Sequence, residues 1–391
     1  MEGDFIKIND WLLPLSWIYG AGVRLRNQMF EMGMLKSRSF DIPVISVGNI
    51  TVGGSGKTPH VEYLINLLRD KVKVAVLSRG YKRKSKGYML ATADTPMSDI
   101  GDEPYQMKKK FADIYVAVDK DRCHGIDQLT TNEETSDTDV ILLDDAYQHR
   151  YVKPGVNILL VDYHRLIMYD KLLPAGRLRE PQKGKARADI VIVSKCPADL
   201  KPMEFRVITK AMNLFPYQKL YFTTLKYGSL RPIYGGEDRK LDTLTGDTSI
   251  LLLTGIASPQ QMIVDLKPYT ERITPLTFPD HHQYTDADID RINAEFEAMK
   301  GNDKMIVTTE KDNARLCGMD GLSDEVKKNI YVLPVEVGFM LDQEEDFNEN
   351  IIGYVRKKSR NSILAKAKDD NKSDNSDNSG NRTRTISFRN N

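Results

Sequence analysis

Cysteine is scarce in this chain, and its pattern excludes two classes of protein. Of 391 residues only three are cysteines, Cys123, Cys196 and Cys317, which lie far apart and are odd in number. None of them has the close spacing of a zinc ribbon or a dithiol redox motif, and they offer no disulfide framework. The chain is therefore expected in a reducing compartment, with its cysteines acting as small apolar residues.

Long apolar runs and an excess of one charge are also missing. No run approaches the roughly 18 residues that a membrane-spanning helix needs. The first ten residues, MEGDFIKIND, carry acids where a secretory signal carries bases. Lys and Arg number 56 against 55 Asp and Glu, a formal net charge of +1. We therefore expect no nucleic-acid partner, and a place in the cytosol or on the cytosolic face of a membrane.

Residues 11–35 differ in composition from the rest of the chain. Leu, Ile, Val, Met and Phe are mixed there with Trp17, Arg24 and Arg26. The pattern predicts an amphipathic helix, or two helices separated at a proline or a glycine. Trp and Tyr beside Arg are typical of a membrane interface. A helix that docks on the protein core has a similar apolar face, so this alternative stays open.

From about residue 42, short β-branched runs alternate with segments of helical length. The runs are continuously apolar, as in strands buried on both faces of a parallel sheet. Alternation of strand and helix indicates an α/β layered fold. Strands are predicted at 43–47, 72–77, 114–118, 140–143, 157–161 and 189–193.

The composition then shifts. Residues 216–245 hold Tyr, Thr and Gly in extended pieces, which predict a β-ribbon between two domains. A second α/β stretch follows, and beyond about residue 361 Asp, Asn, Ser and Lys predict disorder. In the second stretch we predict strands at 250–253, 304–307 and 330–335 and helices at 259–266 and 286–299. The predicted division is 1–40 for the N-terminal helix, 41–215 for a P-loop domain, 216–245 for the linker, 246–356 for a smaller α/β domain and 357–391 for a disordered tail.

The strongest motif is a glycine-rich loop between a strand and a helix, VISVGNITVGGSGKTPHVEYLINLL at 44–68. Its glycines let backbone amides face an anion, and the helix N-terminus adds positive partial charge. Lys57 is expected to reach the β- and γ-phosphates of a nucleotide, and Thr58 to bind Mg²⁺. Thr51 replaces the first glycine of the usual pattern, so the start of the loop should differ in shape; a plain glycine-rich turn is the alternative. The residues predicted to contact the nucleotide here are Thr51, Val52, Gly53, Gly54, Ser55, Gly56, Lys57 and Thr58.

A second motif, VILLDDAYQHR, places acids at the end of a buried strand. Asp144 and Asp145 follow four apolar residues, at the sheet edge where open α/β proteins bind ligands. Asp144 is predicted to hold Mg²⁺ with Asp145 beside it, although an ordinary cap at a strand end has the same sequence. Gln148 and His149 follow within one turn and are candidates for orienting a phosphate or the attacking group.

Seven motifs occur in order along the chain: GNITVGGSGKTP, SRGY, GDEP, LDDAYQHR, LPAGRLREP, PDHHQY and TTEKD. As an ordered set they resemble the tetraacyldisaccharide 4′-kinases, the lipid A 4′-kinases of Gram-negative bacteria, over about residues 10–355. The resemblance implies transfer of the ATP γ-phosphate to the 4′-hydroxyl of a tetraacylated glucosamine disaccharide 1-phosphate, which gives lipid IVA. It also implies two α/β/α P-loop-like domains joined by a two-stranded linker.

The resemblance further implies cofactors and partners. ATP and Mg²⁺ are the expected cofactors, and an acylated disaccharide lipid is the expected substrate. Residues 11–35 would contact an anionic membrane surface, which places the protein peripherally on the cytoplasmic face of the inner membrane. We expect a monomer.

Family roles carry over to matching positions. Asp102 in GDEP matches the carboxylate proposed to take the proton from the sugar hydroxyl, although a helix N-cap is the alternative for this residue. His281 in PDHH matches the histidine that orients this acid, and the adjacent His282 leaves the assignment open by one residue. Lys57 and Asp145 complete the predicted catalytic set. Because Asp102 and His281 fall in different predicted domains, the pair implies a cleft between them.

Arg179 and Glu180 match an arginine–glutamate pair near the nucleotide in the same family. Arg179 is expected to clamp phosphate charge, and Glu180 to become a metal ligand on domain closure. A surface ion pair is the alternative. Glu310, Lys311 and Asp312 of TTEKD begin a predicted helix and are interpreted as capping and salt-bridge residues.

Two other functions fit part of the sequence. A P-loop GTPase or metallochaperone shares the loop, but the guanine-recognition spacing N/T-K-x-D is missed by both SKCPAD at 194–199 and TEKD at 309–312. A soluble kinase for another sugar or small metabolite shares everything except the membrane role of the N-terminal helix. Nucleotide preference and vesicle binding would separate these functions from a lipid kinase.

Overall fold

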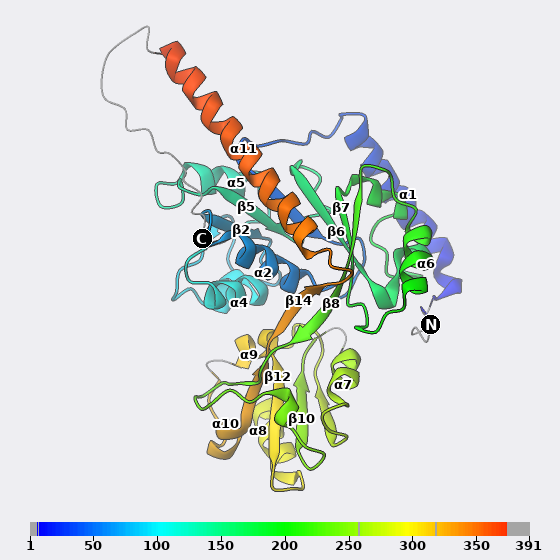
Figure 1. Ribbon diagram of the computed structural model, residues 1–391, viewed down its shortest axis with the longest axis vertical. Helices are drawn as coiled ribbons and strands as arrows, with labels where there is room; N and C mark the ends of the chain where they lie inside the picture. Colours follow the sequence, from blue (N-terminus) through cyan, green and yellow to red (C-terminus); the bar gives the residue numbers. More distant parts are fainter. Residues whose placement is uncertain (1–5, 7, 257–258, 317–318, 374–391) are drawn as a thin grey trace.

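The computed structural model describes residues 6, 8–256, 259–316 and 319–373. The chain forms two lobes, each built on its own sheet (Figure 1). We call the part on the nine-stranded sheet the N lobe and the part on the five-stranded sheet the C lobe. The predicted α/β class with parallel sheets is confirmed.

The N-lobe sheet has the strand order β14-β8-β7-β6-β1-β5-β2-β4-β3. Its neighbouring strands are parallel except for β3 with β4 and β14 with β8. The six strands predicted here are confirmed, each end lying within two residues of its predicted position. The strands are β1 (Val44–Gly48), β2 (Val74–Ser78), β3 (Met89–Leu90), β4 (Tyr115–Val118), β5 (Val140–Asp144), β6 (Val156–Asp162), β7 (Ile190–Ser194), β8 (Lys219–Tyr227) and β14 (Val335–Phe339).

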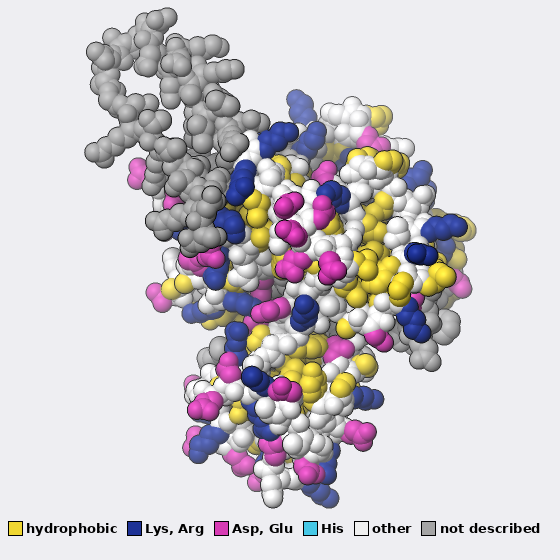
Figure 2. All heavy atoms as spheres, viewed as in Figure 1, with side chains coloured by type: hydrophobic (Ala, Val, Ile, Leu, Met, Phe, Trp, Pro, Cys, Tyr) yellow, Lys and Arg dark blue, Asp and Glu magenta, His cyan; other side chains and the backbone are white. Residues whose placement is uncertain are grey.

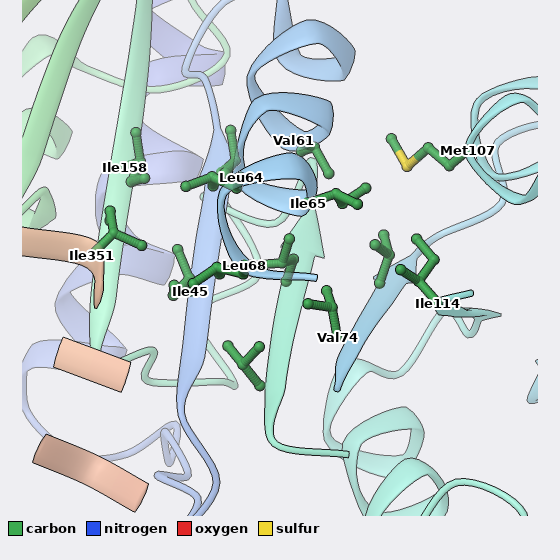
Figure 3. Packing of buried hydrophobic residues seen from close by; sticks show 14 of the residues in the cluster. Ile45, Val61, Leu64, Ile65, Leu68, Val74, Met107, Ile114, Ile158 and Ile351 are labelled. Atoms are coloured by element: carbon green, nitrogen blue, oxygen red, sulfur yellow. The ribbon is translucent and has the colours of Figure 1, made fainter. Parts of the chain in front are cut away.

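Helices cover both faces of this sheet. On one face Ile45 of β1, Leu64 of α2 and Ile351 of α11 lie in one apolar core (Figure 3). Burial on both faces explains the continuously apolar strands, since alternate residues enter different cores. The N-lobe helices are α1 (Leu13–Glu31), α2 (Lys57–Leu68), α3 (Met97–Ile100), α4 (Asp102–Lys110), α5 (Arg122–Thr131), α6 (Pro202–Met212) and α11 (Glu344–Ser373), with short 3₁₀ turns η1 (Asp10–Leu12), η2 (Tyr163–Arg165), η3 (Ile167–Tyr169) and η4 (Gln182–Arg187).

The C lobe has a smaller sheet in the order β11-β10-β12-β13-β9. Its predicted helices and the strands predicted at 250–253 and 304–307 are confirmed, whereas the strand predicted at 330–335 ends at Leu333 and β11 was not predicted. The sequence of β11, ITPLT, has no continuous apolar run because it is an edge strand with most side chains partly or fully exposed. The elements are β9 (Arg231–Pro232), β10 (Ser249–Thr254), β11 (Ile273–Thr277), β12 (Lys304–Thr309), β13 (Ile330–Leu333), α7 (Gln260–Leu266), α8 (Asp286–Ala298), α9 (Glu310–Leu316), α10 (Asp324–Asn329) and η5 (Leu241–Thr243).

The link between the lobes differs from the predicted ribbon at 216–245. Strand β8 leaves the N lobe and pairs with β14, which returns from the C lobe, in the antiparallel register Val335↔Tyr227 to Phe339↔Thr223 (Figure 1). The predicted segment therefore supplies one strand of the connection, and its partner comes from over a hundred residues later in the chain. Composition marks extended segments but carries no information about their partners.

The predicted boundary at residue 356 is wrong. The segment after β14 returns to the N lobe, where Phe347, Ile351 and Val355 of α11 are buried in the same core as β1 and α2. Apolar residues spaced four apart along α11 form the stripe that makes this contact.

The predicted tail at 357–391 is also partly wrong, because α11 continues to Ser373. The Ala, Leu and Lys residues at 363–368 favour a helix once the preceding turns are anchored. Residues 374–391 lie outside the described residues. Within the described chain no helix combines the length and the hydropathy needed to cross a bilayer. Figure 2 shows basic and acidic side chains mixed over the face in view, which fits the net charge of +1.

Candidate active site

The glycine-rich loop connects β1 to α2, as the motif predicted. Gly56, directly before Lys57, has φ = 76°, a left-handed conformation that glycine adopts without strain. Inside the loop Asn49 Nδ2 donates to Ser55 Oγ at 2.8 Å. The N-terminal amides of α2 therefore face the end of a buried strand, the usual geometry of a phosphate site.

The structure at the start of the loop explains why Thr51 can stand where the usual motif has a glycine. Thr51 forms an antiparallel bridge with Leu178, and Val52 N donates to Arg177 O at 2.8 Å. Arg179 N donates in turn to Ile50 O at 2.8 Å. Backbone pairing with the segment 177–179 fixes the turn, so the loop does not need the glycine that usually stands at position 51.

The last residue of β7 and the residue that follows it support the loop from the other side. Ser194 Oγ donates to Ser55 O at 2.9 Å, and Lys195 Nζ donates to the carbonyl of Gly54. Lys195 Nζ also lies 3.0 Å from Asp162 Oδ2. Neither residue was predicted as part of the site. Their position at the carboxyl end of a parallel strand next to β6 was the signal available in the sequence.

Asp144 ends β5 at the same sheet edge and is 1% exposed. Its Oδ2 accepts a hydrogen bond from Ser78 Oγ at 3.2 Å, whereas Oδ1 is buried and, within the described chain, has no hydrogen-bond partner. Burial, together with the charges of Glu103 and Asp145, raises the pKa of Asp144 to about 7. An orphaned carboxylate oxygen in this position fits a divalent cation, since a cation would compensate both the missing partner and the neighbouring acids.

Asp145 is turned toward the cations of the site. It has φ = 47°, and its carboxylate lies 3.5 Å from Lys57 Nζ and 3.9 Å from Arg179 Nη1. The predicted phosphate ligands Lys57 and Arg179 thus meet at one acid. An incoming phosphate would compete with this carboxylate for both cations.

The carboxylate of Glu180 is engaged by two neighbouring side chains. Its buried carboxylate forms a two-pronged ion pair with Arg187, and it accepts a hydrogen bond from Asn27 Nδ2 at 3.0 Å. A carboxylate that neutralises a largely buried guanidinium would leave that charge unpaired if it moved to a metal. We therefore leave Glu180 out of the proposed metal site.

Gln148 and His149 lie in the turn that follows Asp145. Gln148 is half-buried there. The Nε2 atom of His149 is buried and, among the described residues, has no hydrogen-bond partner. Burial and the charge of Arg122 lower the pKa of His149 to about 4. A neutral imidazole can offer a phosphate a hydrogen bond but no positive charge.

Asp102 and His281 meet across the two lobes. Asp102 begins α4, after Gly101 with φ = 90°, and His281 follows β11 in the C lobe. His281 Nδ1 lies 2.8 Å from Asp102 Oδ2. His282 instead contacts Asp288 at 2.9 Å, so of the two histidines His281 is the one in contact with Asp102.

Two cationic side chains of the C lobe also hold Asp102, and neither was predicted in this role. Arg315 Nη2 donates to Asp102 Oδ2 at 2.5 Å, and Lys311 Nζ lies 3.8 Å from the same oxygen. Burial raises the pKa of Asp102, but the hydrogen bond from His281 and the charges of Lys311 and Arg315 outweigh it and hold this pKa well below its usual range. Asp102 is therefore a carboxylate at every physiological pH.

Arg315 is itself held rigidly. Its side chain is 2% exposed, and Nη1 donates to Gly255 O at 2.9 Å and to Asp312 Oδ1 at 3.0 Å. The acid Asp312 lies three residues before Arg315 on α9, which was the sequence signal for a paired buried arginine. A small cavity of about 70 Å³ opens beside Asp102, lined also by Tyr81, His281 and Arg315. It can admit a hydroxyl and its neighbouring atoms, but not a whole sugar.

A second ionic contact joins the lobes next to this pair. Lys110 Nζ at the end of α4 lies 2.6 Å from Glu62 Oε2 of α2 and 2.8 Å from Glu310 Oε1 of α9. The salt-bridge interpretation of Glu310 and Lys311 is thereby confirmed. The P-loop helix, the helix of Asp102 and the C lobe are thus linked through one lysine.

Comparisons of the sequence and of the structure relate this chain to known proteins. The family model for Tetraacyldisaccharide-1-P 4′-kinase matches residues 8–356. A Tetraacyldisaccharide 4′-kinase of Phocaeicola vulgatus is 61% identical over 93% of this chain and 99% of its own, and one of Bacteroides fragilis is 54% identical over 95% of this chain and 100% of its own. The crystal structure of an "apo" form of LpxK from Aquifex aeolicus in complex with ATP aligns with a TM-score of 0.68 at 31% identity, covering 88% of this chain and 99% of that one.

Proposed function

Because the chain belongs to the tetraacyldisaccharide-1-phosphate 4′-kinase family, we propose that it transfers the γ-phosphate of ATP to the 4′-hydroxyl of a tetraacylated glucosamine disaccharide 1-phosphate. The observation that carries this proposal is the contact of Asp102 with His281 across the lobes, beside a P-loop in the N lobe. A proton acceptor from one lobe and its partner from the other form a complete group only when the lobes are together. Phosphoryl transfer from ATP benefits from such closure because it excludes water.

In this proposal the P-loop binds the triphosphate. The loop amides at 53–58 and Lys57 hold the phosphate oxygens, and Arg179 adds a second cation beside them. Thr58 and Asp144 would hold Mg²⁺, which supplies charge neutralisation for the β- and γ-phosphates when bound. The buried, unpaired Oδ1 of Asp144 supports this assignment.

Asp102 acts on the acceptor hydroxyl. Its Oδ1 accepts a hydrogen bond from Glu103 N at 3.0 Å and lies beside the small cavity, where a hydroxyl could donate to it. The hydrogen bond from His281 and the charges of Lys311 and Arg315 make it a weak base, which suffices when the transition state is loose and the hydroxyl proton leaves late. His281 and Arg315 align the carboxylate so that the oxygen nucleophile points at the phosphorus.

The acyl chains of the substrate need an apolar surface near this site. A groove of about 740 Å³ runs between α1 and residues 170–187. Its apolar wall includes Leu13, Trp17 and Leu172, and Arg24 and Lys171 lie beside it. We propose that acyl chains lie along the wall while the basic side chains meet the 1-phosphate.

The exposed side of α1, together with the preceding turn η1, would face the membrane. Trp11, Trp17 and Ile18 are 81%, 67% and 72% exposed. Large apolar side chains are usually far less exposed than this in a soluble protein. We propose that this surface rests on anionic lipid at the cytoplasmic face of the inner membrane, with the protein as a peripheral monomer.

The test is phosphate transfer from γ-labelled ATP to the tetraacylated disaccharide 1-phosphate in mixed micelles with Mg²⁺. The wild-type chain should form a bisphosphorylated lipid, and Lys57→Ala should not. ATP hydrolysis without a lipid product would retain the nucleotide site and reject the lipid substrate, in favour of a soluble kinase or a GTPase.

Asp102→Asn tests the base. We expect kcat to fall by about 10²–10⁴-fold, while ATP affinity stays near that of the wild type because Asp102 lies outside the P-loop. The amide still accepts a hydrogen bond from Arg315, so the fold should survive. A near wild-type kcat would remove Asp102 from the mechanism. Isothermal titration with a non-hydrolysable ATP analogue is the control for binding.

A further inference from the structure

Three side chains of types that can bind metal ions, none with a part in the proposed transfer, converge between α5 and the turn after β5. Asp121, Cys123 and His149 each place one donor atom within 4.8 Å of the other two. Across residues 6, 8–256, 259–316 and 319–373, no other group of three His, Cys, Asp or Glu side chains is this close. The two segments are far apart in sequence, so the tertiary fold creates the cluster.

The cluster is held in place by the backbone. Asp121 is the N-cap of α5, and its Oδ1 accepts from Cys123 N at 2.9 Å and from His124 N at 3.3 Å. These bonds fix the direction of the carboxylate. Cys123 Sγ lies 3.5 Å from Tyr151 O, to which its thiol donates. The third member, His149, brings a buried imidazole nitrogen that lacks a partner in the described chain.

The donor set selects the metal. Mg²⁺ prefers six oxygen ligands, whereas one carboxylate oxygen, one sulfur and one imidazole nitrogen suit a tetrahedral, borderline-soft cation. We propose that Asp121, Cys123 and His149 bind a Zn²⁺-type ion, with water in the fourth position. On binding, the Cys123 thiol releases its proton to solvent and the thiolate takes up the metal.

His149 is already in the form that such a metal needs. Burial and the nearby Arg122 charge keep its pKa at about 4, so the imidazole is neutral near pH 7. The bound ion would tie the N-terminus of α5 to the turn that contains Asp145 and Gln148. None of its three ligands is shared with the proposed Mg²⁺ site at Thr58 and Asp144.

Cobalt titration of the full-length chain tests the proposal, since Co²⁺ bound by a thiolate gives a charge-transfer absorption band. The titration is run with excess Mg²⁺ to occupy oxygen-rich sites. Wild type and the matched control Cys196→Ser, which removes a buried thiol elsewhere in the N lobe, should bind one Co²⁺ per chain with this band. Zn²⁺ should abolish it.

Cys123→Ser should lose the band and weaken Zn²⁺ binding by at least about tenfold, the loss that even an outer partner of a metal ligand produces. Asp121→Asn should also weaken binding, and it keeps the helix cap because Asn caps as well as Asp. Circular dichroism checks that each variant folds, and Asp121→Asn tests the site even if Cys123→Ser does not fold. A band that persists in Cys123→Ser, or equal Zn²⁺ affinity in all four proteins, would overturn the proposal.

Discussion

Two acids of the proposed site carry opposite pKa shifts although they are the same residue type. Asp102 is surrounded by His281, Lys311 and Arg315, which keep it ionised. Asp144 is fully buried beside other acids, so burial raises its pKa to about 7. The first environment suits a hydrogen-bond acceptor for a hydroxyl, and the second suits a ligand that becomes charged when a cation arrives.

The raised pKa of Asp144 makes Mg²⁺ binding depend on pH. Protonated Asp144 cannot bind the ion, so Mg²⁺ affinity should increase as pH rises through about 7. Without metal, the folded state retains a proton that the unfolded state loses near pH 4. Stability should therefore fall as pH rises from about 4 to about 7. Mg²⁺ should raise the Tm more at about pH 8 than at about pH 6.

Asp144→Asn is the control for this pH effect. The amide is close in shape and does not titrate, so both the pH dependence of Mg²⁺ binding and the metal-free stability loss should disappear. Thermal melts at the two pH values, with and without Mg²⁺, measure both effects. An equal Mg²⁺ effect in wild type and variant would place the ion elsewhere.

Among the elements, helix α1 has both features expected from its sequence: one side docks on the protein core, and the other exposes apolar side chains. Its inner side docks on the N lobe, where Ser16 Oγ donates to Leu172 O at 3.0 Å and Tyr19 Oη donates to Arg179 O at 2.8 Å. Its outer side leaves Ile18 and Leu25 exposed. One helix can thus serve the fold and a lipid surface at once.

Charged substitutions on the outer side of α1 should weaken membrane binding. Ile18→Glu and Leu25→Glu each remove an apolar group that contributes about 1.5–3 kcal/mol on burial, so binding to anionic vesicles should fall by about tenfold or more for each. ATP affinity should not change. Val264→Glu alters an exposed apolar residue of the C lobe and is the matched control. Vesicle sedimentation measures the effect, and unchanged binding would argue against α1 as the contact.

The contact of α4 with α9 predicts a stability effect. Lys110→Met leaves Glu62, which is largely buried, without its cation and also breaks the link to Glu310. We expect the free energy of unfolding to fall by up to about 3 kcal/mol. Glu310→Gln breaks the contact of Lys110 with the C lobe but keeps its ion pair with Glu62, so it should lower the free energy of unfolding by less. Chemical denaturation measures the free energy of unfolding of both variants. A larger loss in Glu310→Gln than in Lys110→Met would contradict this prediction.

On the scale of the whole molecule, the two lobes are interleaved along the chain. The chain leaves the N lobe at β8 and returns to it through β14, and α11 then completes the N-lobe core. The C lobe is therefore an insertion between parts of the N lobe. Its position relative to the P-loop depends on two adjacent strands and on the ionic contacts around Asp102 and Lys110.

Phe347→Ala tests this interleaving. Phe347 is 1% exposed in the core shared with β1 and α2, so the free energy of unfolding should fall by about 3–5 kcal/mol. The loss should appear in the N lobe, with weaker ATP binding at 37 °C, although Phe347 lies far beyond the P-loop in sequence. Val264→Ala, at an exposed site, should change stability by less than about 0.5 kcal/mol. Equal stability of the two variants would contradict the interleaved core.

The sequence by itself determined the local features: most of the buried parallel strands, the phosphate loop and the acids at the end of β5. These depend on apolar runs and glycine positions within a few residues. Tertiary structure decided the pairing of β8 with β14, the return of α11 to the N lobe and the ion pair between Glu180 and Arg187. The tertiary structure also decided which histidine contacts Asp102, and it placed Arg315 against the Asp102 carboxylate. Contacts between distant segments depend on packing and charge across the fold, which the local pattern of a sequence does not contain.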